Sequence, residues 1–107
     1  MGKNYLGQLE ELVLLATLRL DGEGYGASIQ ELIAEEGKRE VSLGALYATL
    51  DRLERKGFIS SKQGEATPER GGRARRYFKV EAAGKAALRE TEASRRGIAA
   101  GLKVRLV

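Results

Sequence analysis

The spacing of apolar residues along this chain predicts four helices separated by turns, and one hairpin. In the clearest helix, leucines recur at steps of three and four residues, which places them on one face: Leu43, Leu46, Leu50 and Leu53. Ser42 precedes this stripe as an N-cap, and Gly57 follows it as a helix stop. Similar patterns predict further helices over the ranges Tyr5–Leu20, Ala27–Glu36 and Glu81–Leu106.

A hairpin is predicted between the third and the fourth helix. Its strands would cover Ile59–Glu65 and Arg75–Val80, and the loop between them holds the only proline and a Gly-Gly pair. Alternation along the second strand places Phe78 and Val80 on one side, and Arg75, Tyr77 and Lys79 on the other. Positive charge gathers at the tip and the return strand, at Arg70, Arg73, Arg75 and Arg76. Such a hairpin either contacts a polyanion or carries charges that merely blunt its edges, and the neighbouring helix favours the first interpretation.

The face of the third helix opposite its leucines is small near the start of the helix and cationic near its end. It carries Gly44, Ala45, Ala48, Arg52 and Arg55, with Ser42, Thr49 and Lys56 beside them. Small residues allow a backbone to approach a surface closely, and arginines bind phosphates or base edges. The preceding helix has an acidic outer surface and is joined by a glycine-containing turn, so the pair is typical of a helix-turn-helix. The alternative is an ordinary amphipathic surface helix.

The first and last helices carry more apolar surface than a chain of 107 residues is expected to cover. Leu12, Leu14, Leu15 and Leu18 spread apolar surface nearly all the way round the second half of the first helix. This pattern predicts either a second subunit packed against it or a fully buried central helix. The last helix is too long to pack wholly on so small a domain, so we expect it to reach toward a partner subunit.

The composition narrows the possible functions. The chain has no cysteine and no histidine, which removes disulfides, thiolate chemistry and the commonest general base and metal ligand. No Ser–Lys pair, carboxylate cluster or phosphate-cradling loop is evident, so we expect neither an enzyme nor a metal or cofactor site. The net charge of +4 is compatible with a polyanionic partner. No apolar run reaches the length of a membrane span and Met1–Leu20 lacks the features of a secretory signal, so we expect a cytoplasmic protein without membrane contact.

Taken in order, these elements predict a mainly α fold with a small two-stranded β wing. This is a winged helix-turn-helix with an added C-terminal dimerisation helix. Residues 1–80 would form the DNA-binding domain, and residues 81–107 the C-terminal helix. The alternative is a winged-helix module that binds a partner protein and no DNA. The basic hairpin argues against it, because a protein-binding wing has no need of four arginines.

Several runs of the sequence resemble the PadR family of bacterial transcriptional regulators. They cover about Leu6–Leu88 and occur in this order: LGQLEELVLLATL, GYGASIQELI, SLGALYATLDRLERKGFI and RARRYFKVEAAGKAAL. The resemblance implies a homodimer that binds a palindromic operator in double-stranded DNA and usually represses a nearby gene. It also implies that the third helix enters the major groove, that wing arginines meet adjacent phosphates or the minor groove, and that the first and last helices form the dimer interface.

The resemblance and the helix face together define two candidate sets. The family's recognition-helix motif falls on Ser42, Gly44, Tyr47 and Thr49, and its wing motif on Arg75 and Arg76. The candidate DNA-binding residues are Ser42, Gly44, Ala45, Tyr47, Ala48, Thr49, Arg52, Lys56, Lys62, Arg73, Arg75 and Arg76. The candidate dimer-interface residues are Leu12, Leu15, Leu88, Ile98 and Leu102.

The chain departs from the family pattern at three positions. It has Leu43 where the family often has proline, Ala45 where it often has threonine, and Glu81 where a threonine usually caps the last helix. We expect the change at 45 to remove one phosphate contact and the change at 81 to loosen the helix start. Some relatives sense drugs through a tryptophan in the dimer cavity. This chain has no tryptophan, so that mode is not expected, and any effector would be an unidentified small molecule.

Overall fold

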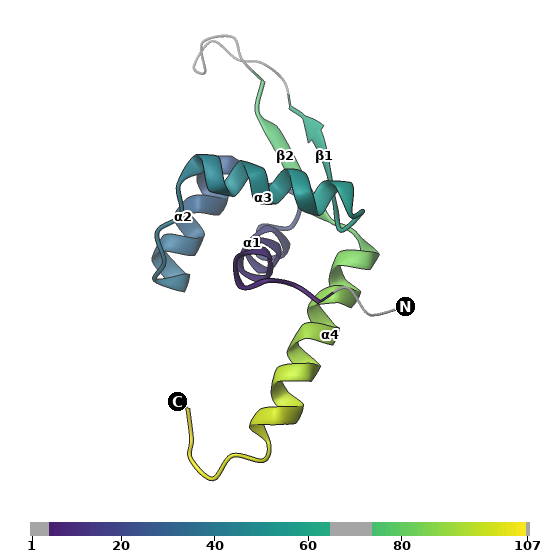
Figure 1. Cartoon of the computed structure of the whole chain (residues 1–107). Coiled ribbons are helices and arrows are strands. Elements are labelled where there is room, and N and C mark those ends of the chain that lie inside the picture. Colours follow the sequence, from purple (N-terminus) through teal and green to yellow (C-terminus); the bar gives the residue numbers. More distant parts are fainter. Residues whose placement is uncertain (1–4, 65–73, 107) are drawn as a thin grey trace.

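A computed structural model describes residues 5–64 and 74–106, and these residues form four helices and a two-stranded sheet (Figure 1). In chain order the elements are α1 (Gln8–Arg19), α2 (Gly26–Gly37), α3 (Leu43–Arg55), β1 (Ile59–Gln63), β2 (Arg76–Val80) and α4 (Ala82–Ala99). The predicted fold class, mainly α with a small β wing, is confirmed. None of these helices combines the length and the apolar character needed to cross a membrane.

The boundaries of α3 follow its sequence signals. The Ser42 hydroxyl accepts a hydrogen bond from the Ala45 amide at 3.1 Å, which satisfies one of the unpaired N–H groups of the first turn. Beyond the other end, Gly57 has a φ of +79°, a conformation that glycine adopts without strain. Both signals predicted from the sequence therefore operate in the structure.

The first and last helices are shorter than predicted. α1 begins at Gln8 instead of Tyr5, and α4 ends at Ala99 instead of Leu106. From Glu92 onward the described residues are all exposed. Without packing in this segment, nothing offsets the helix-weakening glycines that the sequence contains there.

α3 lies across α1 with three of the four stripe leucines buried, whereas Leu43 at the start of the helix is 45% exposed. Leu46, Leu50 and Leu53 are fully buried in one apolar cluster with Val13 and Leu14 of α1. Burying a leucine side chain contributes about 1.5–3 kcal/mol, so this face fixes the rotation of α3 about its own axis. The opposite face of α3 therefore turns toward solvent.

The two strands form the predicted antiparallel hairpin. Ile59 pairs with Val80 at its base, and Phe78 and Val80 are buried as the alternation predicted. The Phe78 amide also donates a hydrogen bond to the Gly24 carbonyl oxygen at 2.9 Å. This bond ties the hairpin to the turn between α1 and α2, so the wing has a fixed base.

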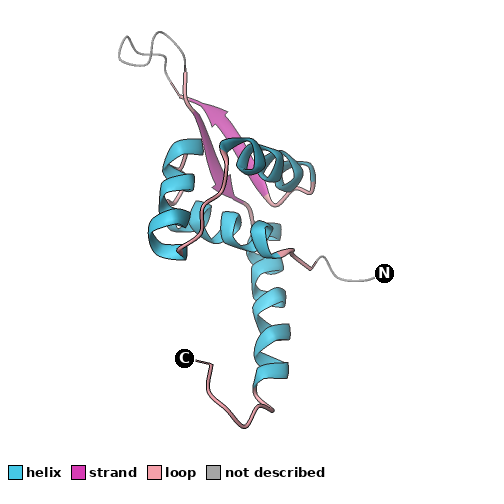
Figure 2. Cartoon of the chain, turned by 60° about the vertical axis from the view of Figure 1, so that its left-hand side comes forward, coloured by secondary structure: helices cyan, strands magenta, loops and turns pink. Residues whose placement is uncertain are grey.

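α4 is anchored through its first half. Gly84 is buried where a side chain would collide with the carbonyl oxygen of Phe58. Leu88 packs in the core, and the Thr91 hydroxyl accepts a hydrogen bond from the Leu6 amide at 3.4 Å. The C-terminal end of α4 extends away from the other elements (Figure 2). One end of α4 is thus part of the core, and the other end is available to a partner.

The start of α4 lacks a side-chain cap. Glu81 occupies the N-cap position and makes no side-chain capping hydrogen bond. Its carboxylate accepts a hydrogen bond from the Ser60 hydroxyl of β1 instead. The acidic residue that replaces the family's threonine therefore joins α4 to the wing.

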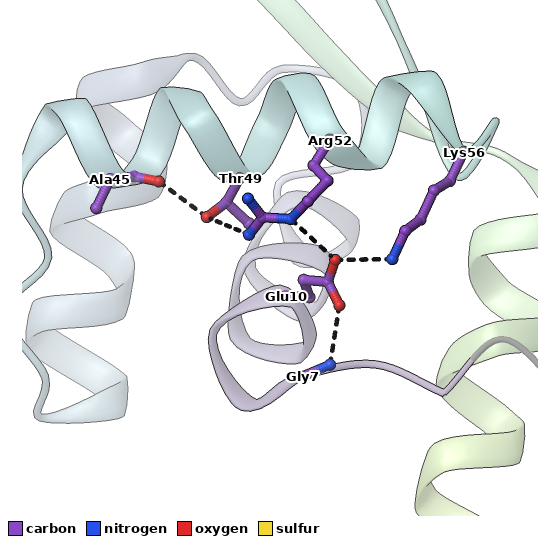
Figure 3. A network of polar contacts seen from close by, with 6 residues as sticks. All are labelled: Gly7, Glu10, Ala45, Thr49, Arg52 and Lys56. Atoms are coloured by element: carbon purple, nitrogen blue, oxygen red, sulfur yellow. Dashed lines mark hydrogen bonds and ion pairs between the residues drawn. The ribbon is translucent and has the colours of Figure 1, made fainter.

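A buried carboxylate joins the first turn of α1 to the end of α3 (Figure 3). Glu10 Oε2 accepts hydrogen bonds from Lys56 Nζ at 2.9 Å and from Arg52 Nε at 3.3 Å, and its Oε1 accepts one from the Gly7 amide at 2.9 Å. The Glu10 side chain is 10% exposed. Burial raises the pKa of Glu10, but the hydrogen bonds from Gly7, Lys56 and Arg52 outweigh it and hold this pKa below its ordinary value of 4.5.

Replacing Glu10 with glutamine is expected to lower the free energy of unfolding by about 1–3 kcal/mol at neutral pH, because the charged hydrogen bonds to Arg52 and Lys56 are lost. The pKa of Glu10 is lowered by folding. Its charge therefore stabilises the fold above the unfolded-state pKa, and this contribution disappears as the pH falls through the folded-state pKa. Urea titrations of the two chains should show their stabilities converging between neutral pH and about pH 3.

Glu31→Gln is the matched control, because Glu31 lies exposed on α2. This control should change the free energy of unfolding by less than about 0.5 kcal/mol. A Glu10→Gln deficit that stays equally large in acid would show that the carboxylate charge is not what stabilises the joint.

Candidate nucleic-acid interface

The solvent-facing side of α3 carries small residues near its start, and Asp51 and Arg55 nearer its end. Ser42, Gly44, Ala45 and Ala48 are all exposed, and a Cβ at Gly44 would meet no other atom within 4 Å. Arg55 is exposed on the same side. In the part of the chain that the structure describes, Arg55 has no carboxylate oxygen within 4.0 Å. This face can therefore approach a grooved surface closely and present an unneutralised cation to it.

Arg55 is absent from the candidate DNA-binding set, although its position carried a signal. At 100° per residue it lies half a turn from Leu46 and Leu53, which makes it more outward than Arg52. The sequence pattern placed Arg55 on the basic face, and in the structure Arg55 is exposed.

Thr49 does not lie on this exposed face. Thr49 is only 1% exposed, and its hydroxyl donates a hydrogen bond to the Ala45 carbonyl oxygen at 2.8 Å. Thr49 lies next to Leu46 and Leu53 on the helix surface, and α1 covers that flank. The predicted contact between Thr49 and DNA is therefore corrected: this side chain belongs to the core and cannot reach a ligand of the exposed face.

Two of the predicted phosphate-binding cations are turned toward α1. Arg52 and Lys56 both bind the Glu10 carboxylate, and Arg52 Nη2 donates a further hydrogen bond to the Thr49 hydroxyl at 3.4 Å (Figure 3). The Arg52 side chain is nevertheless 46% exposed, and that of Lys56 38%. Both cations are thus partly neutralised within the chain while still accessible from solvent.

Arg76 of the wing is held in the same way, by acids on α3. Its guanidinium donates a hydrogen bond to Glu54 Oε1 at 2.5 Å and lies 3.8 Å from Asp51 Oδ1. It also donates to the Ser61 hydroxyl at 3.0 Å and covers the Phe78 ring. Arg76 therefore clamps the hairpin onto α3, a structural role that the wing motif did not predict.

Arg75 and Lys62 lie on the opposite side of the hairpin. The Arg75 guanidinium stacks over the Tyr25 ring, 3.9 Å from its centre, and Tyr25 meets Tyr77 edge to face. Lys62 is exposed and pairs with Tyr77 across the two strands. Stacking on an aromatic ring orients a guanidinium without neutralising it, so Arg75 is available to bind an anion. The predicted contacts at Arg70 and Arg73 lie outside the described residues.

Tyr47 lies at the junction of α3 and α2. Its side chain is exposed at its edge, and its hydroxyl lies over Gly26, where any side chain would overlap it. The first turn of α2 begins at Gly26, so unpaired backbone amides of that turn are close by. Tyr47 thus packs against the start of α2 while 40% of the residue stays exposed.

Two of the candidate dimer-interface residues, Leu15 and Leu88, line a groove of about 480 Å³ between α1 and α4. Its lining residues are Glu11, Leu15, Leu18, Lys85, Leu88, Arg89, Glu92 and Arg95. Leu15 is exposed, Leu12 is half-buried, and Leu88 belongs largely to the core of its own chain. Ile98 and Leu102 are exposed beyond the groove, Ile98 to 79%. A single chain therefore leaves α1 and α4 with uncovered apolar surface, and α1 is not a fully buried central helix.

The described residues contain no group of three or more His, Cys, Asp or Glu side chains able to hold a metal ion. The α3 face and the hairpin can instead offer a small, closely approachable surface flanked by cations. Such an arrangement fits a polyanion with a groove.

Comparisons with known proteins give the same picture. Residues 14–90 match the family described as the transcriptional regulator PadR-like family. Over 70 residues the chain is 43% identical to the transcriptional regulator Rv3488 of Mycobacterium tuberculosis, a match that covers 65% of this chain and 61% of that protein. The chain thus spans less than two thirds of the length of this relative.

Solved structures agree in fold. A PadR-like transcription factor from Bacteroides fragilis has a TM-score of 0.71 and 31% identity, over 86% of this chain and 84% of that one. A PadR family transcriptional regulator from Eggerthella lenta has a TM-score of 0.70 and 27% identity, over 88% and 81% of the two chains. The family match takes in the whole α3 face and the hairpin. This chain therefore belongs to the PadR-like family of transcriptional regulators.

Proposed function

We propose that this chain is a cytoplasmic, sequence-specific DNA-binding regulator that acts as a homodimeric repressor on a palindromic operator. The exposed face of α3 is the observation that carries the proposal. Its side chains are small where the helix begins, and Arg55 projects from its last turn. A helix with this face can lie deep in a major groove. The hairpin projects beyond α3 (Figure 1), where it would meet the flanking backbone.

The proposed contacts divide by position on this surface. Ser42, Gly44, Ala45 and Ala48 would face the bases, and the Tyr47 hydroxyl a phosphate. The proposed phosphate-binding cations are Arg52, Arg55, Lys56, Lys62, Arg73, Arg75 and Arg76, of which Arg73 rests on the basic sequence of the hairpin alone. Few long side chains face the bases, so we expect much of the specificity to come from DNA shape and deformability.

The proposed dimer forms through α1 and α4. Residues 1–80 would bind DNA and residues 81–107 would hold the two subunits together, with Leu12, Leu15, Ile98 and Leu102 at the interface. The support is the uncovered apolar surface of these two helices in a single chain. Two α3 helices in such a dimer would contact half-sites about one helical turn apart.

Ala48→Glu is expected to weaken binding to the DNA upstream of the protein's own gene at least about a hundredfold, because a carboxylate would face the groove at close range. Fluorescence anisotropy with that DNA measures the effect. Ala34→Glu is the matched control, since Ala34 is exposed on α2 and the charge change is identical. Equal affinities of the two variants would exclude the α3 face from the interface.

The dimer proposal predicts that Leu15→Glu combined with Ile98→Glu gives a monomer, because two buried charges would replace apolar contacts. Analytical ultracentrifugation of the free protein measures the mass. Leu43→Glu serves as a control, because Leu43 is an exposed leucine on α3. It should remain dimeric. A wild-type monomer, or a dimeric double variant, would contradict the proposed interface.

A further inference from the structure

The cations of the proposed DNA interface differ in how far the chain itself neutralises them. Arg52 and Lys56 share the Glu10 carboxylate, whereas Arg55, on the same helix, has no carboxylate oxygen within 4.0 Å in the described residues. Since all three cations lie within the last turns of α3, a phosphate backbone along this helix would meet a mixture of neutralised and free charges.

Glu10 is fixed in place, while its two partners are not. Its side chain is 10% exposed, and the Gly7 amide holds Oε1 so that Oε2 faces both cations. The Arg52 and Lys56 side chains are 46% and 38% exposed, and each carries its charged group on a flexible aliphatic chain. A phosphate that binds Arg52 or Lys56 must share that cation with Glu10, or else remove one partner from the buried Glu10 carboxylate. Removing a partner from a buried charge raises the free energy of the complex.

We propose that Glu10 limits the affinity of this interface for DNA phosphates, because its fixed carboxylate competes with them for Arg52 and Lys56. This inference rests on the proposed DNA-binding function. Non-specific DNA binding depends almost wholly on phosphate contacts. Competition by Glu10 therefore lowers the non-specific affinity directly. A complex with the operator also has base and shape contacts, which Glu10 leaves intact. Glu10 thus lowers the phosphate-derived affinity for any duplex, and discrimination between sequences rests on the base and shape contacts.

The neighbouring residue provides a matched control. Glu11 lies on the same turn of α1 and has a side chain 9% exposed, but its carboxylate pairs with Arg95 of α4. Glu10→Gln and Glu11→Gln therefore change the net charge equally and remove a buried carboxylate at adjacent positions. Glu10→Gln frees two cations of α3, and Glu11→Gln frees none of them.

The test is a salt titration of binding to a random-sequence duplex and to the upstream DNA, with the full-length chain and both variants. Glu10→Gln should bind the random duplex about three- to tenfold more tightly at low salt, with a log–log slope steeper by up to about 0.9 for each freed cation. Its affinity for the upstream DNA should rise by a similar factor. Glu11→Gln should leave the slope unchanged. Circular dichroism checks that each variant is folded.

A second comparison needs no change at Glu10. Arg55→Gln should flatten the salt slope on the random duplex by about 0.9 for each bound subunit, and Arg52→Gln by clearly less, because Glu10 already neutralises Arg52. Equal flattening by the two variants would overturn the inference, as would a Glu10→Gln slope equal to or shallower than that of the wild type. A wild-type chain that binds neither duplex would overturn the proposed function itself, and this inference with it.

Discussion

Burial of the leucine face of α3 is the constraint on which the rest of this structure depends. Leu46, Leu50 and Leu53 pack against α1, and their loss from the core would cost several kcal/mol. With these side chains inside, the rotation of α3 is settled: Thr49 falls within the core, and Ala48 falls outside it. The small exposed face of the helix is therefore a consequence of how the core packs.

Two acids in the first turn of α1 form ion pairs with the end of α3 and with α4. Glu10 binds the cations at the end of α3, and Glu11 binds Arg95 of α4. Buried carboxylates need partners, because an unpaired one costs several kcal/mol. Through Glu10 and Glu11, α1 thus holds both α3, which is proposed to contact DNA, and α4, which is proposed to form the dimer.

Local sequence signals predicted much of this architecture, but they could not predict pairs of side chains that are far apart in the sequence. The Ser42 cap, the Gly57 stop and the order of elements depend on nearby residues, and all three appear in the structure. The partners of charged side chains depend on tertiary packing. Glu10 and Arg52 are 42 residues apart, and no local pattern joins them.

The same limit applies to the wing and to the end of α4. The sequence placed Arg76 in the wing motif, but only the packing of the hairpin on α3 brings Glu54 to it. The end of α4 was misplaced because helix propensity alone does not show where packing stops. The sequence predicted the exposed face of α3, but it did not predict that Arg52 and Lys56 form ion pairs with Glu10.

The most direct test of the central claim is a salt titration of wild-type binding to the DNA upstream of its own gene and to random DNA of equal length. We predict that the upstream DNA binds about a thousandfold more tightly or better, with one dimer per site and a slope near −0.9 for each neutralised phosphate. Binding to neither DNA at low salt would contradict the proposal that this chain acts by binding DNA.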